Sequence, residues 1–177
     1  MQCFTPIECS DWLRQRSIIE FPYGTKREAM TFQFETPHSP RKLTAFTRQL
    51  FDAFGEFSGA LLQFVDWPTY KPDEMALITS LRRSHGEQRW LIDAPGHLFA
   101  PTELAEAIGQ CYLASTFDWS VYLYMASGAG TVYFWEGDLI DYFGFDKSIS
   151  KKVHEVIKNY DLRVTYDVQQ VAGANVH

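Results

Sequence analysis

Apolar residues recur at helical spacing in four segments of the chain. In residues 40–54 they fall on one face, and Ser39 followed by Pro40 is a typical helix start. The same spacing predicts three further helices and a short fifth one, in the order Asp11–Arg16, Pro72 to about Ser84, Pro101 to beyond Tyr112, and from a Ser148 cap to Tyr160.

Strand patterns lie between these helices. Met30, Phe32 and Phe34 alternate with polar residues, as the residues of a half-buried strand do. Asp118–Met125 and Thr131–Trp135 flank a glycine-containing loop, which is typical of a hairpin. Apolar runs predict further strands at Ala60–Val65, Arg89–Ile92 and Arg163–Val168. We therefore predict one α+β domain over residues 1–177, with a mixed sheet of about six strands, including the 118–135 hairpin, and four to five helices packed against it.

Composition agrees with a folded domain. The chain has 177 residues, of which 46% are hydrophobic and 21% charged. No apolar run approaches the about 18 residues that span a membrane, and no signal peptide is evident at the N-terminus. The three cysteines, Cys3, Cys9 and Cys111, match no zinc spacing. We expect a reduced, cytoplasmic protein that does not bind a membrane.

The charge of the chain is unevenly distributed. The 57 residues from Trp90 to Asp146 contain no lysine or arginine but eight carboxylates, whereas residues 1–89 hold 11 basic and 11 acidic residues. Two of the eight, Glu103 and Glu106, have a local explanation, because carboxylates in the first turn of a helix favourably meet its positive end. A field of one sign can select and steer a basic partner.

The predicted hairpin and the segment after it combine this charge with aromatic residues. If the apolar side of the hairpin faces the core, its tyrosines and tryptophan remain for solvent or a partner. Segment 136–146 then interleaves carboxylates with large apolar residues, although Leu139, Ile140 and Phe143 could equally anchor an ordinary connection. The candidate partner-binding residues are Tyr122, Tyr124, Tyr133, Trp135, Glu136, Asp138 and Asp141.

Other chemistry has less support in the sequence. The carboxylates of segment 136–141 do not follow the EF-hand pattern, so we predict no metal and no cofactor. Basic residues occur as scattered pairs without a phosphate-binding stripe, and the pI is about 5.3, so we predict no nucleic-acid binding. One enzyme hypothesis remains open, in which Asp93 and His97 converge as an acid–base pair after a predicted strand.

These observations favour a small, acidic, non-enzymatic binding protein. Its most concrete form is an immunity or inhibitor protein that blocks a basic toxin such as a nuclease, since size and composition are similar to those of many bacterial toxin-immunity proteins. That similarity includes no shared motif. The alternatives are an enzyme that uses Asp93 and His97, and a phage or assembly protein that self-associates through the hairpin. The oligomeric state is left open.

Overall fold

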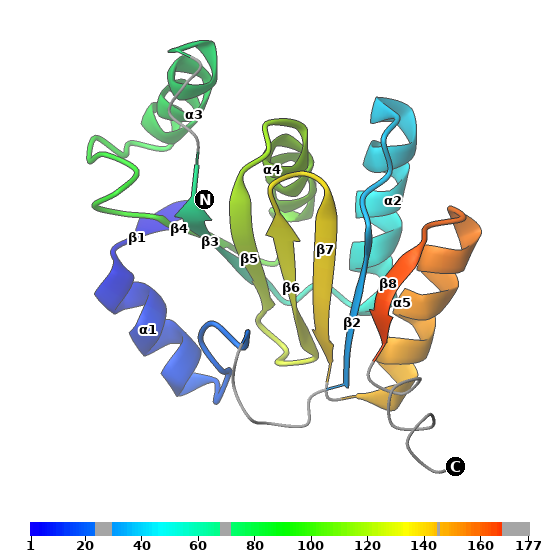
Figure 1. The fold of residues 1–177 in the computed structure, drawn as a ribbon. Coiled ribbons are helices and arrows are strands. Elements are labelled where there is room, and N and C mark those ends of the chain that lie inside the picture. Colours follow the sequence, from blue (N-terminus) through cyan, green and yellow to red (C-terminus); the bar gives the residue numbers. More distant parts are fainter. Residues whose placement is uncertain (24–29, 68–71, 145, 168–177) are drawn as a thin grey trace, which may run out of the picture.

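The computed structural model describes residues 1–23, 30–67, 72–144 and 146–167. They form one antiparallel sheet whose strand order is β1-β4-β3-β5-β6-β7-β2-β8 (Figure 1). Its strands are β1 (Gln2–Phe4), β2 (Met30–Glu35), β3 (Ala60–Asp66), β4 (Gly96–Phe99), β5 (Ser120–Met125), β6 (Gly130–Trp135), β7 (Leu139–Gly144) and β8 (Val164–Asp167).

Five helices in the described residues pack around this sheet. They are α1 (Pro6–Gln15), α2 (Pro40–Ala53), α3 (Pro72–Ser84), α4 (Leu104–Thr116) and α5 (Lys147–Asn159). Side-chain caps define several helix starts, as expected from sequence. Thr5 and Glu8 form a capping box at α1, and the Ser39 hydroxyl accepts a hydrogen bond from the Lys42 amide at α2. None of the described helices is both long and apolar enough to cross a membrane.

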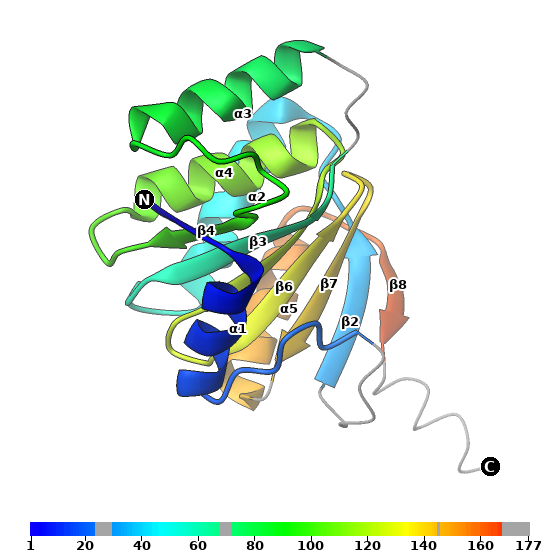
Figure 2. The same cartoon turned by 90° about the vertical axis from the view of Figure 1, so that its left-hand side faces the viewer.

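The two faces of the sheet are covered differently. Helices α2, α4 and α5 pack on one face, and α3 lies beside α4 near the β4 side of the sheet (Figures 1 and 2). This face holds the main core, to which β5 contributes Val121 and Leu123. A smaller core on the other face joins α1 to β3, β5 and Phe143 of β7, whereas none of the described helices covers β6, β2 and β8 on that side (Figure 2).

The predicted α+β class is confirmed, but the sheet differs from the prediction in two respects. It is antiparallel throughout rather than mixed, and it has eight strands rather than about six. The strands that the sequence did not place are β1, β4 and β7. The β7 strand was hidden because both of its faces are buried, so its residues show no clean alternation of apolar and polar positions.

Residues 89–92 do not form the predicted strand. They belong to the loop between α3 and β4, where Trp90 is 71% exposed and Ile92 is 70% exposed, and only Leu91 is buried. The strand of this region begins later, at Gly96. An apolar run forms a central strand only where other elements cover both of its sides. Here one side, with Trp90 and Ile92, is exposed to solvent.

Several helix boundaries also move. The predicted Asp11–Arg16 helix begins earlier, at Pro6, and Asp146 rather than Ser148 caps α5 by accepting hydrogen bonds from two backbone amides. Glu103 is the N-cap residue of α4 but makes no side-chain cap. Its carboxylate accepts hydrogen bonds from the Ala100 amide and the Met1 amino group instead.

Candidate interaction face on the α1 side of the sheet

A row of polar side chains crosses the α1 side of the sheet. Strand register places one residue from each of six neighbouring strands in line, and we call this set the transverse row: Gln63, Tyr122, Tyr133, Asp141, Gln33 and Tyr166. The residues come from β3, β5, β6, β7, β2 and β8. Because the row depends on strand pairing, its members are scattered over the sequence from Gln33 to Tyr166.

Hydrogen bonds satisfy the transverse row only in part. Gln33 Nε2 donates to Asp141 Oδ1 at 2.9 Å, and Gln63 Nε2 donates to Glu20 Oε1 at 3.2 Å. Asp141 Oδ2 and Gln63 Oε1 are buried and have no hydrogen-bond partner among the described residues. Burial raises the pKa of the Asp141 carboxyl, against the opposing effect of the Gln33 hydrogen bond. This arrangement costs stability, which is common at functional sites.

Aromatic rings form a continuous cluster on the same face. Tyr122 stacks on Tyr133 with ring centroids 4.2 Å apart, and Tyr133 stacks in turn on Trp135 at 6.3 Å. Phe21 meets the Tyr122 ring edge-on, and Tyr23 meets Trp135 in the same way. With Tyr124, which stacks on Tyr122, these rings form what we call the aromatic cluster: Phe21, Tyr23, Tyr122, Tyr124, Tyr133 and Trp135.

The structure brings the predicted tyrosines and tryptophan together but covers part of the set. Tyr122, Tyr124 and Asp141 are only 5%, 0% and 2% exposed, so these three side chains are buried and do not face solvent as the sequence pattern predicts. Helix α1 together with residues 18–23 covers Tyr122 and Tyr124. Tyr133 and Trp135 are half-buried.

The most exposed rings of the cluster are two that sequence reasoning missed. Phe21 is 41% exposed and Tyr23 is 58% exposed. The Phe21 amide donates to the Tyr124 hydroxyl at 3.1 Å, and the Glu20 carboxylate accepts a hydrogen bond from the Ser10 hydroxyl. Residues 20–21 are therefore hydrogen-bonded to both β5 and α1. The available signal was an apolar segment without helical or strand periodicity, which indicates side chains that pack outside regular elements.

Carboxylates lie at one end of this face. Trp135 and Asp138 flank a two-residue turn in which Glu136 and Gly137 both have positive φ, as a tight hairpin requires. Asp118 lies against Gly137, and both Glu136 and Asp66 act electrostatically on Tyr133. Four exposed carboxylates thus surround the ends of β3 and β6 and the starts of β5 and β7. We call them the carboxylate rim: Asp66, Asp118, Glu136 and Asp138.

The proposed Asp93–His97 pair is not present. Asp93 is exposed, whereas His97 is completely buried. Both imidazole nitrogens are occupied, because Nδ1 lies 2.5 Å from Gln110 Oε1 and Nε2 lies 2.8 Å from Arg82 Nη1. Arginine can only donate, so Nε2 accepts and Nδ1 carries the proton. Burial lowers the His97 pKa to about 3, which keeps the ring neutral at pH 7. His97 is a structural acceptor and is not available to Asp93.

The depressed pKa of His97 predicts a loss of stability in acid. In the unfolded chain the His97 imidazole binds a proton near pH 6.5, whereas in the folded chain it does so only near pH 3. The contribution of the neutral His97 ring to the free energy of unfolding is therefore fully present above pH 6.5 and is lost as the pH falls toward 3. The free energy of unfolding should decrease by about 1.4 kcal/mol per pH unit below that point. Urea denaturation at several pH values measures this slope. A His97→Gln variant should show a shallower slope; an unchanged slope would contradict the assignment.

Metal and thiol chemistry gain no support from the geometry. Among the described residues, no group of three histidine, cysteine or acidic side chains is placed to hold a metal ion. Asp141 is buried in the transverse row, whereas Glu136 and Asp138 are exposed at the turn, so the three carboxylates do not form one site. The three cysteines are buried and unpaired, and burial raises the pKa of Cys9 to about 12, so its thiol is not activated.

Comparison with known proteins found no relative of this chain: no protein family, no curated protein and no solved structure matches it. The fold and the interaction face define the protein in structural terms: it is an α+β protein with an antiparallel sheet, and one face of that sheet carries aromatic rings bordered by carboxylates. The function has to be inferred from that face.

Proposed function

We propose that the protein is a non-enzymatic binding module that captures a basic protein through the carboxylate rim and the rings of the aromatic cluster that reach the surface, which are Phe21, Tyr23, Tyr133 and Trp135. Its most concrete form is an immunity-type inhibitor that blocks a basic toxin domain such as a nuclease. One observation carries the proposal: the exposed rings of Phe21 and Tyr23 belong to a cluster that is bordered by four exposed carboxylates.

The two parts of this face would contribute differently to binding. Aromatic rings supply large contact areas at low entropic cost and are enriched among the residues that dominate binding energy. No ion pair joins the rim carboxylates to a basic residue in the described part of the chain. A partner therefore meets negative charges that are already free, and these accelerate the encounter more than they add affinity.

Inhibition would follow from occlusion. A nuclease holds its phosphate-bearing substrate with cationic side chains, and the carboxylate rim presents several negative charges that can take the place of phosphates. The half-buried rings Tyr133 and Trp135 would lie at the interface and exclude water there. The mechanism needs no turnover and no cofactor.

Charge reversal tests this proposal. The partner is first captured from the native host on the immobilised protein at low salt and eluted at high salt. The double variant Glu136→Lys with Asp138→Lys is then expected to associate with it about tenfold more slowly, with a weaker salt dependence, because the steering field is lost. Stopped-flow mixing or surface plasmon resonance measures both quantities.

A matched control separates local from overall charge. Asp52→Lys with Glu56→Lys changes the net charge equally but lies at and just beyond the end of α2, on exposed positions away from the rim. This control should retain most of the association rate. Equal rates for the two double variants, both of them folded by circular dichroism, would contradict the proposed contact surface.

A further inference from the structure

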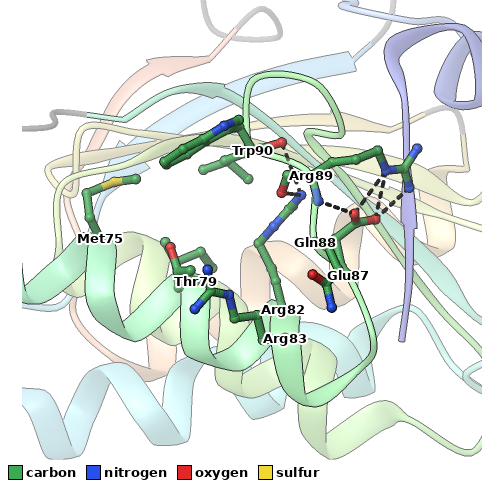
Figure 3. A pocket seen from close by; sticks show the side chains of 10 residues that line it. Met75, Thr79, Arg82, Arg83, Glu87, Gln88, Arg89 and Trp90 are labelled. Carbon is green, nitrogen blue, oxygen red and sulfur yellow. Dashed lines mark hydrogen bonds and ion pairs between the residues drawn. The ribbon is translucent and has the colours of Figure 1, made fainter.

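A second surface feature lies between α3 and the loop that precedes β4. Here α3 and residues 87–91 enclose a small pocket, with Met75, Thr79 and Arg83 on the helix and Trp90 on the loop (Figure 3). Arg89 ties this loop to the edge of the sheet by donating to the Cys3 carbonyl of β1 at 3.0 Å. The pocket is therefore on the β1–β4 side of the sheet, whereas the aromatic cluster is centred on β5 and β6.

A buried arginine holds the loop in place. Arg82 is 2% exposed, and its guanidinium donates to the carbonyls of Arg89, Trp90 and Ala94 as well as to His97. Three carbonyls of one irregular loop are thus fixed to a single helix residue, and Figure 3 shows Arg82 beside Arg89 and Trp90, which supply two of them. A loop fixed in this way loses little further entropy when a partner binds.

The lining of the pocket is mixed, with four apolar residues among polar and charged ones. Its floor includes Ile78 and Leu91, which are 2% and 5% exposed, whereas the Trp90 side chain beside it is 71% exposed. The cavity volume is about 50 Å³. This is well below the about 150 Å³ that accommodates a benzene ring, so the space suits part of an aliphatic side chain rather than an aromatic one.

The charges around the pocket are mainly positive. Arg82, Arg83 and Arg89 line it together with one acidic residue, Glu87. Glu87 is paired with Arg89 at 2.5 Å, and the donors of Arg82 are directed to the loop carbonyls and His97. Arg83 is exposed and forms no ion pair with a described residue. An exposed guanidinium that pairs with no carboxylate of the described residues therefore stands next to a cavity that is partly lined by apolar side chains.

We propose that this pocket docks a partner segment in which an aliphatic side chain is followed closely by a carboxylate. The aliphatic side chain enters the cavity between Met75 and Trp90, and the carboxylate pairs with the guanidinium of Arg83. The required partner is opposite in charge to the one proposed for the carboxylate rim. The two surfaces are consequently independent, and either proposal can fail without the other.

Two short blocked peptides serve as probes, one with the sequence Gly-Leu-Asp-Gly and one with Gly-Leu-Lys-Gly. In ¹H–¹⁵N spectra of the full chain, the first is expected to shift the Trp90 indole signal and the amides of residues 87–91 at millimolar concentration. The second should bind about tenfold more weakly because its lysine is repelled by Arg83. Equal shifts from both peptides, or no shifts in this loop from either, would overturn the proposal.

Variants make the test specific. Arg83→Glu should reverse the preference between the two peptides, and Trp90→Ala should abolish the shifts of the backbone amides of residues 87–91. Ile92→Ala is the matched control, since Ile92 is as exposed as Trp90 but does not line the pocket, and it should bind like the wild type. All three positions are exposed, so the variants should fold. Retention of the original preference by Arg83→Glu would also overturn the proposal.

Discussion

Replacement of Arg82 by methionine is expected to destabilise the protein by about 3–5 kcal/mol, although it removes no residue of the main apolar core. The guanidinium donates to three loop carbonyls and to the Nε2 atom of His97. Without it, the buried Ala94 carbonyl and His97 Nε2 would lose this donor, whereas the Trp90 carbonyl would keep the amides of Asp93 and Ala94. Urea denaturation followed by circular dichroism measures the change. Amide hydrogen exchange of residues 87–94 should accelerate as well, because the loop loses its attachment to α3.

The neighbouring residue supplies the control. Arg83→Met makes the same chemical change one position later on α3, where the side chain is exposed and forms no ion pair with a described residue. Its effect should lie within about 0.5 kcal/mol of zero. Similar losses of stability in the two variants would mean that the Arg82 hydrogen bonds do not hold the loop.

A single methyl group at Gly96 is expected to destabilise the protein by about 1–3 kcal/mol or more. Gly96 lies on β4 directly beneath α1, where a Cβ atom would overlap the Cys9 sulfur and approach Phe4 Cβ to 2.9 Å. The Cys9 side chain is completely buried and cannot turn away, so α1 would have to shift from the sheet. Because α1 covers Tyr124, the variant should also expose part of the aromatic cluster.

Two further variants test the Gly96→Ala mechanism. Adding Cys9→Ala should recover part of the lost stability, because the sulfur that blocks the methyl group is then absent. Gly109→Ala on α4 is the matched substitution without an obstacle, as no atom lies within 4 Å of the added Cβ. It should stabilise the protein by about 0.5–1 kcal/mol through helix propensity. Failure of Cys9→Ala to rescue Gly96→Ala would disprove the overlap with Cys9.

Local sequence patterns predicted part of the interaction face and missed the rest. The β5–β6 hairpin and the shared side of Tyr122, Tyr124, Tyr133 and Trp135 follow from alternation alone, and the structure confirms both. The alternation of residues along a strand shows which side chains share a side, but it cannot show which side other parts of the chain cover. Tyr122 and Tyr124 lie under α1 and residues 18–23, while the rings of Phe21 and Tyr23 are left exposed.

The amino-acid sequence by itself determined the helices, most strands and the concentration of negative charge between Trp90 and Asp146. These properties depend on neighbours within a few positions of each other, through periodicity, capping and turn preference. Even so, local patterns misplaced residues 89–92 and missed β7, because the assignment of an apolar run depends on what covers its faces.

Only the tertiary structure decided where the carboxylates of the block from Trp90 to Asp146 lie in the folded protein. Strand pairing carries Asp141 into the transverse row beside Gln33, whereas Asp118, Glu136 and Asp138 remain outside in the carboxylate rim, joined there by Asp66 from outside the block. The packing of α3 and α4 against β4 brings Arg82 and Gln110 to His97, whereas Asp93 stays in solvent. Each of these outcomes depends on contacts between residues far apart in the chain, and register and packing set them.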